Sequence, residues 1–249
     1  MTSKHLMSCL LMLSLSGCVT ETVKTTKIPA LKTVALPAAE HLLLDVAIPL
    51  FDAGLDDEEA QGITIFSELR KAEAAFMSML LAEALLETGA WGAVRVIPND
   101  ETMMDIKVEG TILYSDGEHL KLNIVVKDSR SRSWLNKDYE ARASLYAYEA
   151  STRTQFDAFQ AVYNNIANDL LDALKLIPEK ERASIRRISE LSFAQSFSPD
   201  AFENYLVTNR DNEIAMMRLP AESDPMLKRI RSIREKDFMY VDTLQDYYS

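Results

Sequence analysis

Three consecutive segments between residues 104 and 145 alternate apolar and polar side chains, and this pattern constrains the fold more than any other feature of the sequence. A period of two is typical of strands that bury one face. An Asp-Gly turn at 115–118 and a polar turn at 128–131 separate the segments, so we expect an antiparallel meander with one face in water. The expected inward positions are Met104, Ile106, Val108, Gly110, Ile112, Leu120, Leu122, Ile124, Val126, Tyr139, Ala141, Ala143 and Leu145.

A long helix is predicted before the meander, over residues 63–88. Its apolar residues recur every three or four positions, which is typical of a helix that buries one face. Gly89 follows the last periodic residue, where a glycine commonly ends a helix. We expect this helix to pack on the sheet through a broad face formed by Ile65, Leu69, Ala72, Phe76, Met79, Leu80 and Leu86.

The remaining patterns complete an α+β architecture. Short apolar runs at 41–51 and 91–97 are typical of strands, and a second long amphipathic helix is predicted over 152–176. We therefore expect a two-layer domain over residues 39–177, in which an antiparallel sheet is covered on one face by two long helices. After Pro178, a helical extension over residues 178–249 is predicted, with helices at 179–192, 199–207 and 224–248.

The N-terminus has the parts of a bacterial export signal. Lys4 precedes a short apolar stretch that ends in small residues, and residues 1–17 are interpreted as a cleaved signal peptide. The tetrapeptide Leu15-Ser16-Gly17-Cys18 resembles the lipobox of bacterial lipoproteins. This resemblance implies acylation of the Cys18 thiol, cleavage before it and acylation of the new amino group. The alternative is an ordinary secretory signal in which Cys18 is incidental.

Residues 18–38 are interpreted as the lipidated cysteine and a tether. The segment is rich in Thr and Lys and contains Pro29 and Pro37, which disfavour regular structure. Such a segment either holds a domain away from the membrane or lies along the domain. Val19 follows the cysteine in place of the Asp that retains similar lipoproteins in the inner membrane. The resemblance therefore implies the outer membrane, with the domain in the periplasm.

Composition excludes several kinds of function. The net charge is −11, and removal of the leader takes away the positive charge of Lys4, so nucleic acid is not expected as a partner. Both cysteines, Cys9 and Cys18, lie in the leader and lipobox, which excludes disulfides and thiolate metal sites from the folded part. Only His41 and His119 follow the leader, and we expect neither a metal nor a cofactor nor an enzymatic activity.

Four polar clusters are candidate sites. The acidic run 56–59 lacks the alternating ligands of a calcium loop and favours a solvated loop. The group 116–119 at a hairpin tip is explained by turn chemistry, and the segment 129–134 by a tight turn. The strongest basic cluster is expected on the outer face of the last helix, where it offers a docking surface for lipid headgroups or an acidic protein. It consists of Lys228, Arg229, Arg231, Arg234 and Lys236.

The order of elements over about residues 40–175 resembles that of known envelope lipoproteins. The resemblance depends on Arg70-Lys71-Ala72-Glu73 and Leu85-Leu86-Glu87-Thr88-Gly89 in the first helix, on Trp91-Gly92-Ala93-Val94, and on Val108-Glu109-Gly110-Thr111-Ile112 in the meander. These segments are similar to auxiliary lipoproteins of ABC-type transport systems and to CsgG- and TolB-N-like lipoprotein domains. The resemblance implies a non-enzymatic, membrane-anchored subunit of a larger complex.

Two functions remain open from the sequence. The first is an accessory or scaffold lipoprotein that binds an envelope transport or assembly complex through its sheet edge or its C-terminal helices. The second is a periplasmic carrier that holds a lipid or another hydrophobic ligand between the helices and the sheet.

Overall fold

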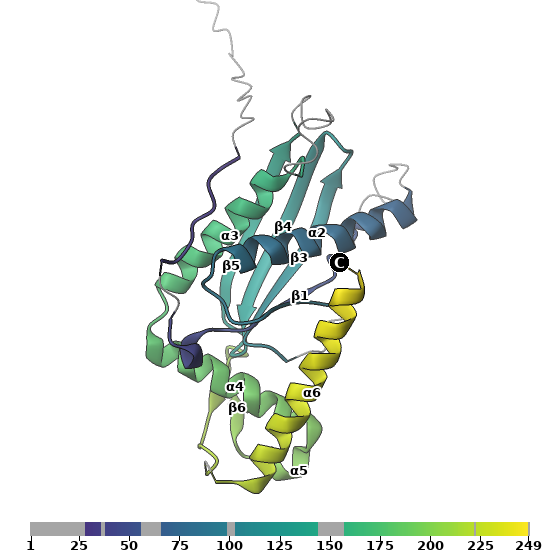
Figure 1. Ribbon diagram of the computed structural model, residues 1–249. Coiled ribbons are helices and arrows are strands. Elements are labelled where there is room, and N and C mark those ends of the chain that lie inside the picture. Colours follow the sequence, from purple (N-terminus) through teal and green to yellow (C-terminus); the bar gives the residue numbers. More distant parts are fainter. Residues whose placement is uncertain are drawn as a thin grey trace, which may run out of the picture.

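The computed structural model describes residues 28–35, 38–55, 66–98, 103–143, 157–221 and 223–248, with side chains as far as residue 243. A five-stranded sheet lies at its centre, with helices on one face and at one end of it (Figure 1), so the predicted α+β class is confirmed. The elements in chain order are η1 (Glu40–Leu42), β1 (Val46–Pro49), α2 (Ser67–Glu87), β2 (Val94–Ile97), β3 (Ile106–Ser115), β4 (His119–Asp128), β5 (Ser133–Arg142), α3 (Gln160–Lys175), α4 (Glu179–Phe197), α5 (Pro199–Phe202), β6 (Leu206–Thr208), β7 (Ile214–Met216) and α6 (Pro225–Tyr248).

The predicted meander is confirmed in β3, β4 and β5, which pair as antiparallel neighbours. Alternate residues of β3 from Ile106 to Ile112 are buried, as the period of two predicts. Gly117 adopts a φ of 82° in the turn between β3 and β4, a conformation that glycine adopts without strain. The Asp116 carboxylate closes this turn by accepting hydrogen bonds from the backbone N–H groups of Glu118 (2.8 Å) and His119 (2.7 Å).

The sheet as a whole is mixed, so the prediction of a purely antiparallel sheet is wrong. The strand order is β2-β1-β3-β4-β5, and β1 runs parallel to both β2 and β3. The reason lies in the connection between β1 and β2, which includes the whole of α2. A helical crossover of this kind joins parallel strands, whereas antiparallel neighbours need only a short turn.

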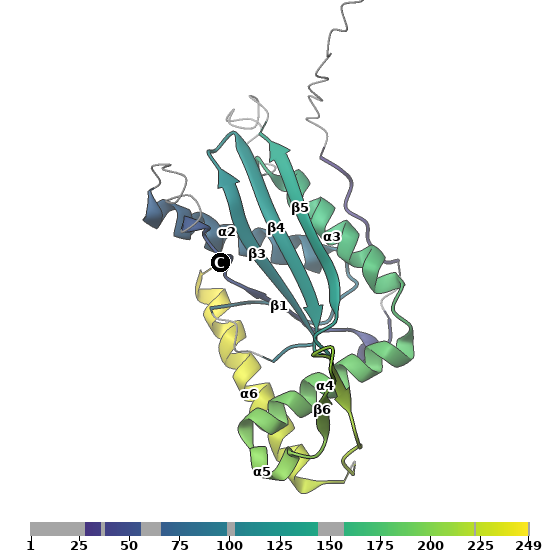
Figure 2. The ribbon, with the colours of Figure 1, turned by 180° about the vertical axis from the view of Figure 1, so that it is seen from behind.

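One face of the sheet is covered by α2 and α3 (Figure 1), whereas Figure 2 shows the opposite face of β3, β4 and β5 without a helix over it. The helix predicted over 152–176 is observed as α3, although residues 152–156 lie outside the described residues. Its apolar face is buried between the two layers, with Val162, Ile166 and Leu170 at most 1% exposed. The packing is close where Phe51 crosses β3, because a Cβ atom at Gly110 would lie 2.6 Å from the Phe51 ring. The core therefore lies between the sheet and these two helices.

The C-terminal part contains three helices and a hairpin. The prediction of a helix over 199–207 is wrong, because α5 ends at Phe202 and the chain then forms the antiparallel pair β6 and β7. Leu191, Phe202 and Leu227 form a small separate core among α4, α5 and α6. Val241 of α6 packs with Ala47 and Ile97 and so joins α6 to β1 and β2.

Part of the expected tether lies along the domain, which is the alternative that the sequence left open. The carbonyl oxygens of Pro29 and Ala30 accept hydrogen bonds from the side-chain amides of Asn164 (2.9 Å) and Asn168 (3.0 Å) on α3. The N–H of Val34 donates to the carbonyl oxygen of Thr88 at the end of α2 (2.9 Å). Residues 29–34 therefore lie beside α3 and the end of α2.

Candidate functional site

The outer side of α2 carries a stripe of exposed apolar residues. Leu69, Phe76 and Leu86 are 59%, 54% and 50% exposed, Ala72 between them is also exposed, and Met79 is half-buried. These residues belong to the face that the periodicity predicted to pack on the sheet, so the predicted orientation of this helix is wrong for them. Leu80 of the same predicted face does pack against the core, and Ile65 lies outside the described residues. We call Leu69, Ala72, Phe76, Met79 and Leu86 the α2 stripe.

The buried face of α2 combines large apolar residues with small and polar ones. The buried face contains Ala74, Met77, Leu81, Ala82 and Leu85 together with Ser78 and Arg70. The Ser78 hydroxyl accepts a hydrogen bond from the backbone N–H of Phe51 (3.0 Å), and Arg70 Nη2 donates to the carbonyl oxygen of Ser115 (2.8 Å). Small side chains allow the helix to lie close to the sheet, and these two polar contacts fix its rotation.

The predicted basic cluster on α6 is divided between two sides of the helix. Lys228, Arg229 and Lys236 are exposed, as expected for an outer face. Arg231 and Arg234 instead face α4, so the prediction that all five residues line the outer face is wrong for these two. The physical reason is that α4 supplies carboxylate and hydroxyl partners at the helix–helix contact.

Arg231 and Arg234 have different partners. Arg231 Nε and Nη2 donate to the two carboxylate oxygens of Glu190, the second at 3.2 Å. Arg234 Nη2 donates to Ser189 Oγ (2.6 Å) and to the carbonyl oxygen of Met103 (3.0 Å). The Arg234 guanidinium also lies 5.0 Å from the centre of the Phe238 ring, and burial lowers its pKa. Both side chains therefore join α6 to its neighbours.

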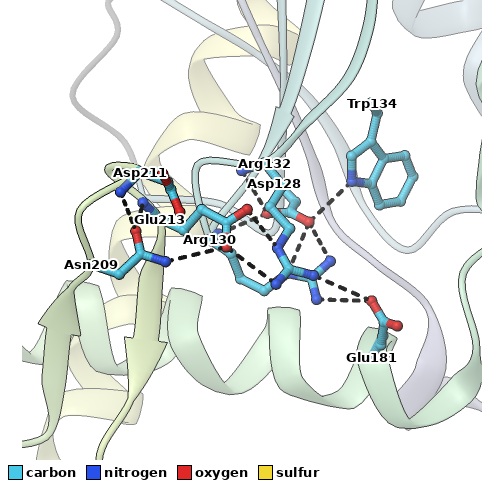
Figure 3. A network of polar contacts seen from close by, with 8 residues as sticks. All are labelled: Asp128, Arg130, Arg132, Trp134, Glu181, Asn209, Asp211 and Glu213. Atoms are coloured by element: carbon cyan, nitrogen blue, oxygen red, sulfur yellow. Dashed lines mark hydrogen bonds and ion pairs between the residues drawn. The ribbon is translucent and has the colours of Figure 1, made fainter.

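The segment 129–134 is part of a buried polar network that joins three regions of the chain (Figure 3). Asp128 Oδ2 accepts hydrogen bonds from Arg130 Nη2 (2.6 Å) and Trp134 Nε1 (3.0 Å). Arg130 Nη1 reaches Glu181 of α4 at 3.0 Å, and the Arg130 carbonyl oxygen accepts from the N–H of Ile214 in β7 (2.9 Å). The arginines of this turn therefore connect the meander to the C-terminal part.

The other sequence candidates do not form a reactive group in the described structure. Hydrogen bonds from the backbone N–H of His119 and from the Tyr114 hydroxyl hold the pKa of the Asp116 carboxyl well below its ordinary value. Glu118 pairs with Arg142 at the end of the neighbouring strand β5. Turn chemistry therefore accounts for the group 116–119. The acidic run 56–59 lies outside the described residues, and so does Cys18.

The described ranges contain neither a membrane-spanning helix nor a metal cluster. In that part of the chain, no helix is both long and apolar enough to cross a bilayer. The same residues contain no group of three or more His, Cys, Asp or Glu side chains that is placed to hold a metal ion. Comparison of the chain with protein-family models and with curated proteins finds no match.

A cavity that sequence reasoning did not anticipate lies between the start of β1 and the helices α4 and α6. Its volume is about 340 Å³. The lining residues come from four separate stretches of the chain, so no local spacing could reveal the site. They are His41, Asp45, Asp105, Ala183, Arg186, Arg187, Glu190, Arg231 and Arg234. We call this space the arginine cavity.

Proposed function

We propose that this protein is a lipid-anchored, non-catalytic accessory or scaffold subunit of an envelope transport or assembly complex. The acyl chains on Cys18 attach it to the periplasmic face of the outer membrane, and the folded part binds a protein of the complex. The lipobox and the resemblance to auxiliary transport lipoproteins support the anchored, accessory role. The α2 stripe supports the binding of a protein partner.

The α2 stripe is the observation on which partner binding depends. Between Leu69 and Leu86 it extends over about 26 Å of helix, at 1.5 Å per residue. A helix that is apolar on both faces is typically covered on both, and exposed apolar stripes are common at protein–protein interfaces. Glu68, Glu83 and Glu87 on the exposed surface of the same helix disfavour an anionic membrane as the occupant. The chemistry fits an apolar helix or strand face of another protein.

The short link between Cys18 and the folded part would keep the α2 stripe near the membrane surface. Roughly ten residues separate Cys18 from Ile28, and an extended chain of this length spans at most about 36 Å. Because residues 29–34 lie along α3, the acylated end is tethered to the layer that contains α2. The stripe would therefore stay within reach of proteins at the same membrane surface.

The packing between the helices and the sheet disfavours the carrier of a hydrophobic ligand. It would need free space between the helices and the sheet. Leu81 of α2, Leu122 of β4 and Ile166 of α3 belong to one core cluster and are fully buried, which leaves no water-sized space beside them.

We predict that Phe76→Asp removes the partner without unfolding the protein. A charge at an interface centre commonly costs 2 kcal/mol or more, so the amount of co-purified partner should fall by about tenfold or more. The measurement is quantitative mass spectrometry of proteins purified with the full-length chain from cross-linked membranes. Leu176→Asp is the matched control, because Leu176 is 81% exposed and lies outside the stripe. Identical partner profiles for both variants and the unchanged protein would contradict the proposal.

A further inference from the structure

The arginine cavity collects four guanidinium groups in a protein whose net charge is −11. Arg186 and Arg187 come from α4, and Arg231 and Arg234 come from α6. Like charges gathered in one cavity repel each other unless something compensates them. The partners of each group therefore decide whether positive charge remains for a ligand.

Two of the four arginines are held mainly by neutral oxygen atoms. Arg186 Nη1 donates to the carbonyl oxygens of Glu40 (2.7 Å) and Leu43 (2.8 Å). Its Nε lies 3.7 Å from Asp105 Oδ2, which is longer than a hydrogen bond. Arg234 is held by the hydroxyl and carbonyl oxygens described above. These contacts position both groups without neutralising their charge.

The three carboxylates of the cavity are already engaged. Asp45 Oδ1 accepts a hydrogen bond from the N–H of Ala93 (2.9 Å), and Asp105 Oδ2 accepts one from the N–H of Asp45 (3.0 Å). Burial raises the pKa of Asp105, although the hydrogen bond from Asp45 and the charges of Arg234 and Arg186 oppose this rise. Glu190 is shared between Arg231 and Arg187, the latter at 3.6 Å. Four guanidinium groups therefore face fewer than four effective negative charges.

One buried donor atom of Arg234 lacks a hydrogen-bond acceptor within the described part of the chain. Its Nε atom is buried and has no hydrogen-bond partner among the described residues. Buried donors without a partner are rare in folded proteins, and a cationic one is costly, because burial removes its hydration. The Nε atom itself is too deeply buried to contact a ligand in the cavity, but an anion there would supply the missing negative charge.

We propose that the arginine cavity binds a small phosphate-bearing ligand. Guanidinium groups bind the oxygen atoms of a phosphate with paired, charge-assisted hydrogen bonds. A volume of about 340 Å³ accommodates a phosphate group with a small organic substituent. This function is additional to partner binding through the α2 stripe, which lies on a different helix.

The test is calorimetric titration of the purified full-length chain, in detergent, with inorganic phosphate and with glycerol 3-phosphate. We expect saturable binding that Arg187→Gln weakens about tenfold, because each charge-assisted hydrogen bond contributes about 1.5–3 kcal/mol. Arg229→Gln removes the same charge from the exposed side of α6, and we expect it to change the affinity less than twofold. Arg187 is chosen in preference to Arg234, since its side chain is 31% exposed and its loss leaves the helix contacts intact.

Separate arms of the experiment distinguish a free phosphate compound from a lipid headgroup. Binding of the soluble phosphates with the Arg187→Gln loss identifies a free compound. Binding only to phosphatidylglycerol vesicles, again lost in Arg187→Gln, identifies a headgroup. Equal binding by Arg187→Gln and Arg229→Gln, or no binding of any probe up to about 10 mM phosphate, would overturn the proposal.

Discussion

Replacement of Asp128 by alanine is expected to lower the free energy of unfolding by about 3–5 kcal/mol. The Asp128 side chain is fully buried and receives four hydrogen bonds within its own turn, two of them from the guanidinium of Arg130. A fifth comes from Trp134 Nε1. Removal of the carboxylate leaves the Arg130 charge, itself 8% exposed, with Glu181 as its remaining ionic partner among the described residues. The measurement is equilibrium unfolding in urea.

The same network supplies a matched control. Glu213 pairs with Arg132 at 3.2 Å, but their side chains are 34% and 46% exposed. Exposed pairs contribute about 0–1 kcal/mol, so Glu213→Ala is expected to have a small effect. The Arg130 carbonyl oxygen accepts a hydrogen bond from the backbone N–H of Ile214 in β7. Because Asp128→Ala loosens Arg130, it should speed hydrogen exchange in β6 and β7. Equal stabilities of the two variants would show that the buried pair does not hold the C-terminal part in place.

Replacement of Cys18 by serine is expected to abolish membrane attachment. Each buried methylene of an acyl chain contributes about 0.8 kcal/mol, so two or more chains hold a protein firmly in the membrane. A protein without an acylated residue has lost this anchor. The measurement is incorporation of a labelled fatty acid in cells, followed by fractionation into membrane and soluble material. We expect the label and the membrane-bound protein to disappear together.

Cys9→Ser is the control for this experiment. Cys9 lies inside the apolar stretch of the leader and has no place in the lipobox, so its loss should leave acylation unchanged. Label retained in Cys18→Ser, or lost equally in both variants, would contradict the assignment of Cys18 as the acylated residue.

Local patterns predicted the parts of the fold that depend on neighbouring residues. The alternation through β3 and β4 and the Asp116-Gly117 turn predicted the meander, because strand period and turn chemistry are local. The α3 stripe was predicted for the same reason. The parallel pairing of β1 was missed because the choice of partner strand depends on the crossover and not on the composition of the strand.

The orientation of α2 shows where periodicity fails. Two large apolar residues of the helix, Leu69 and Phe76, are exposed, while Ala74 and Ser78 face the sheet beside Leu81 and Leu85. The spacing of apolar residues along the helix cannot reveal that Ser78 accepts a hydrogen bond from Phe51, because these residues are 27 positions apart in the sequence. If the α2 stripe is an interface, the helix has two faces that are buried in the complex. The sheet covers one of them, and a partner protein covers the other.

The arginine cavity and the hairpin were missed for different reasons. The cavity joins residues from His41 to Arg234, and no spacing rule covers such separations. The hairpin has strands of three residues, too short for a visible alternation. Its signal was the turn around Asn209 and Asn212, where Asn212 has a φ of 59° and the Asn209 side chain accepts hydrogen bonds from two backbone N–H groups.

The most direct test of the proposed function is photo-cross-linking in cells from position 72, on the exposed side of α2. A photoreactive residue there is predicted to trap one dominant envelope protein, and the product should disappear when Phe76→Asp is added. The same residue at position 140, on the polar face of β5, should not trap that protein. Cross-links from position 72 to lipid alone, or to no protein, would contradict the proposal that the α2 stripe binds a partner subunit.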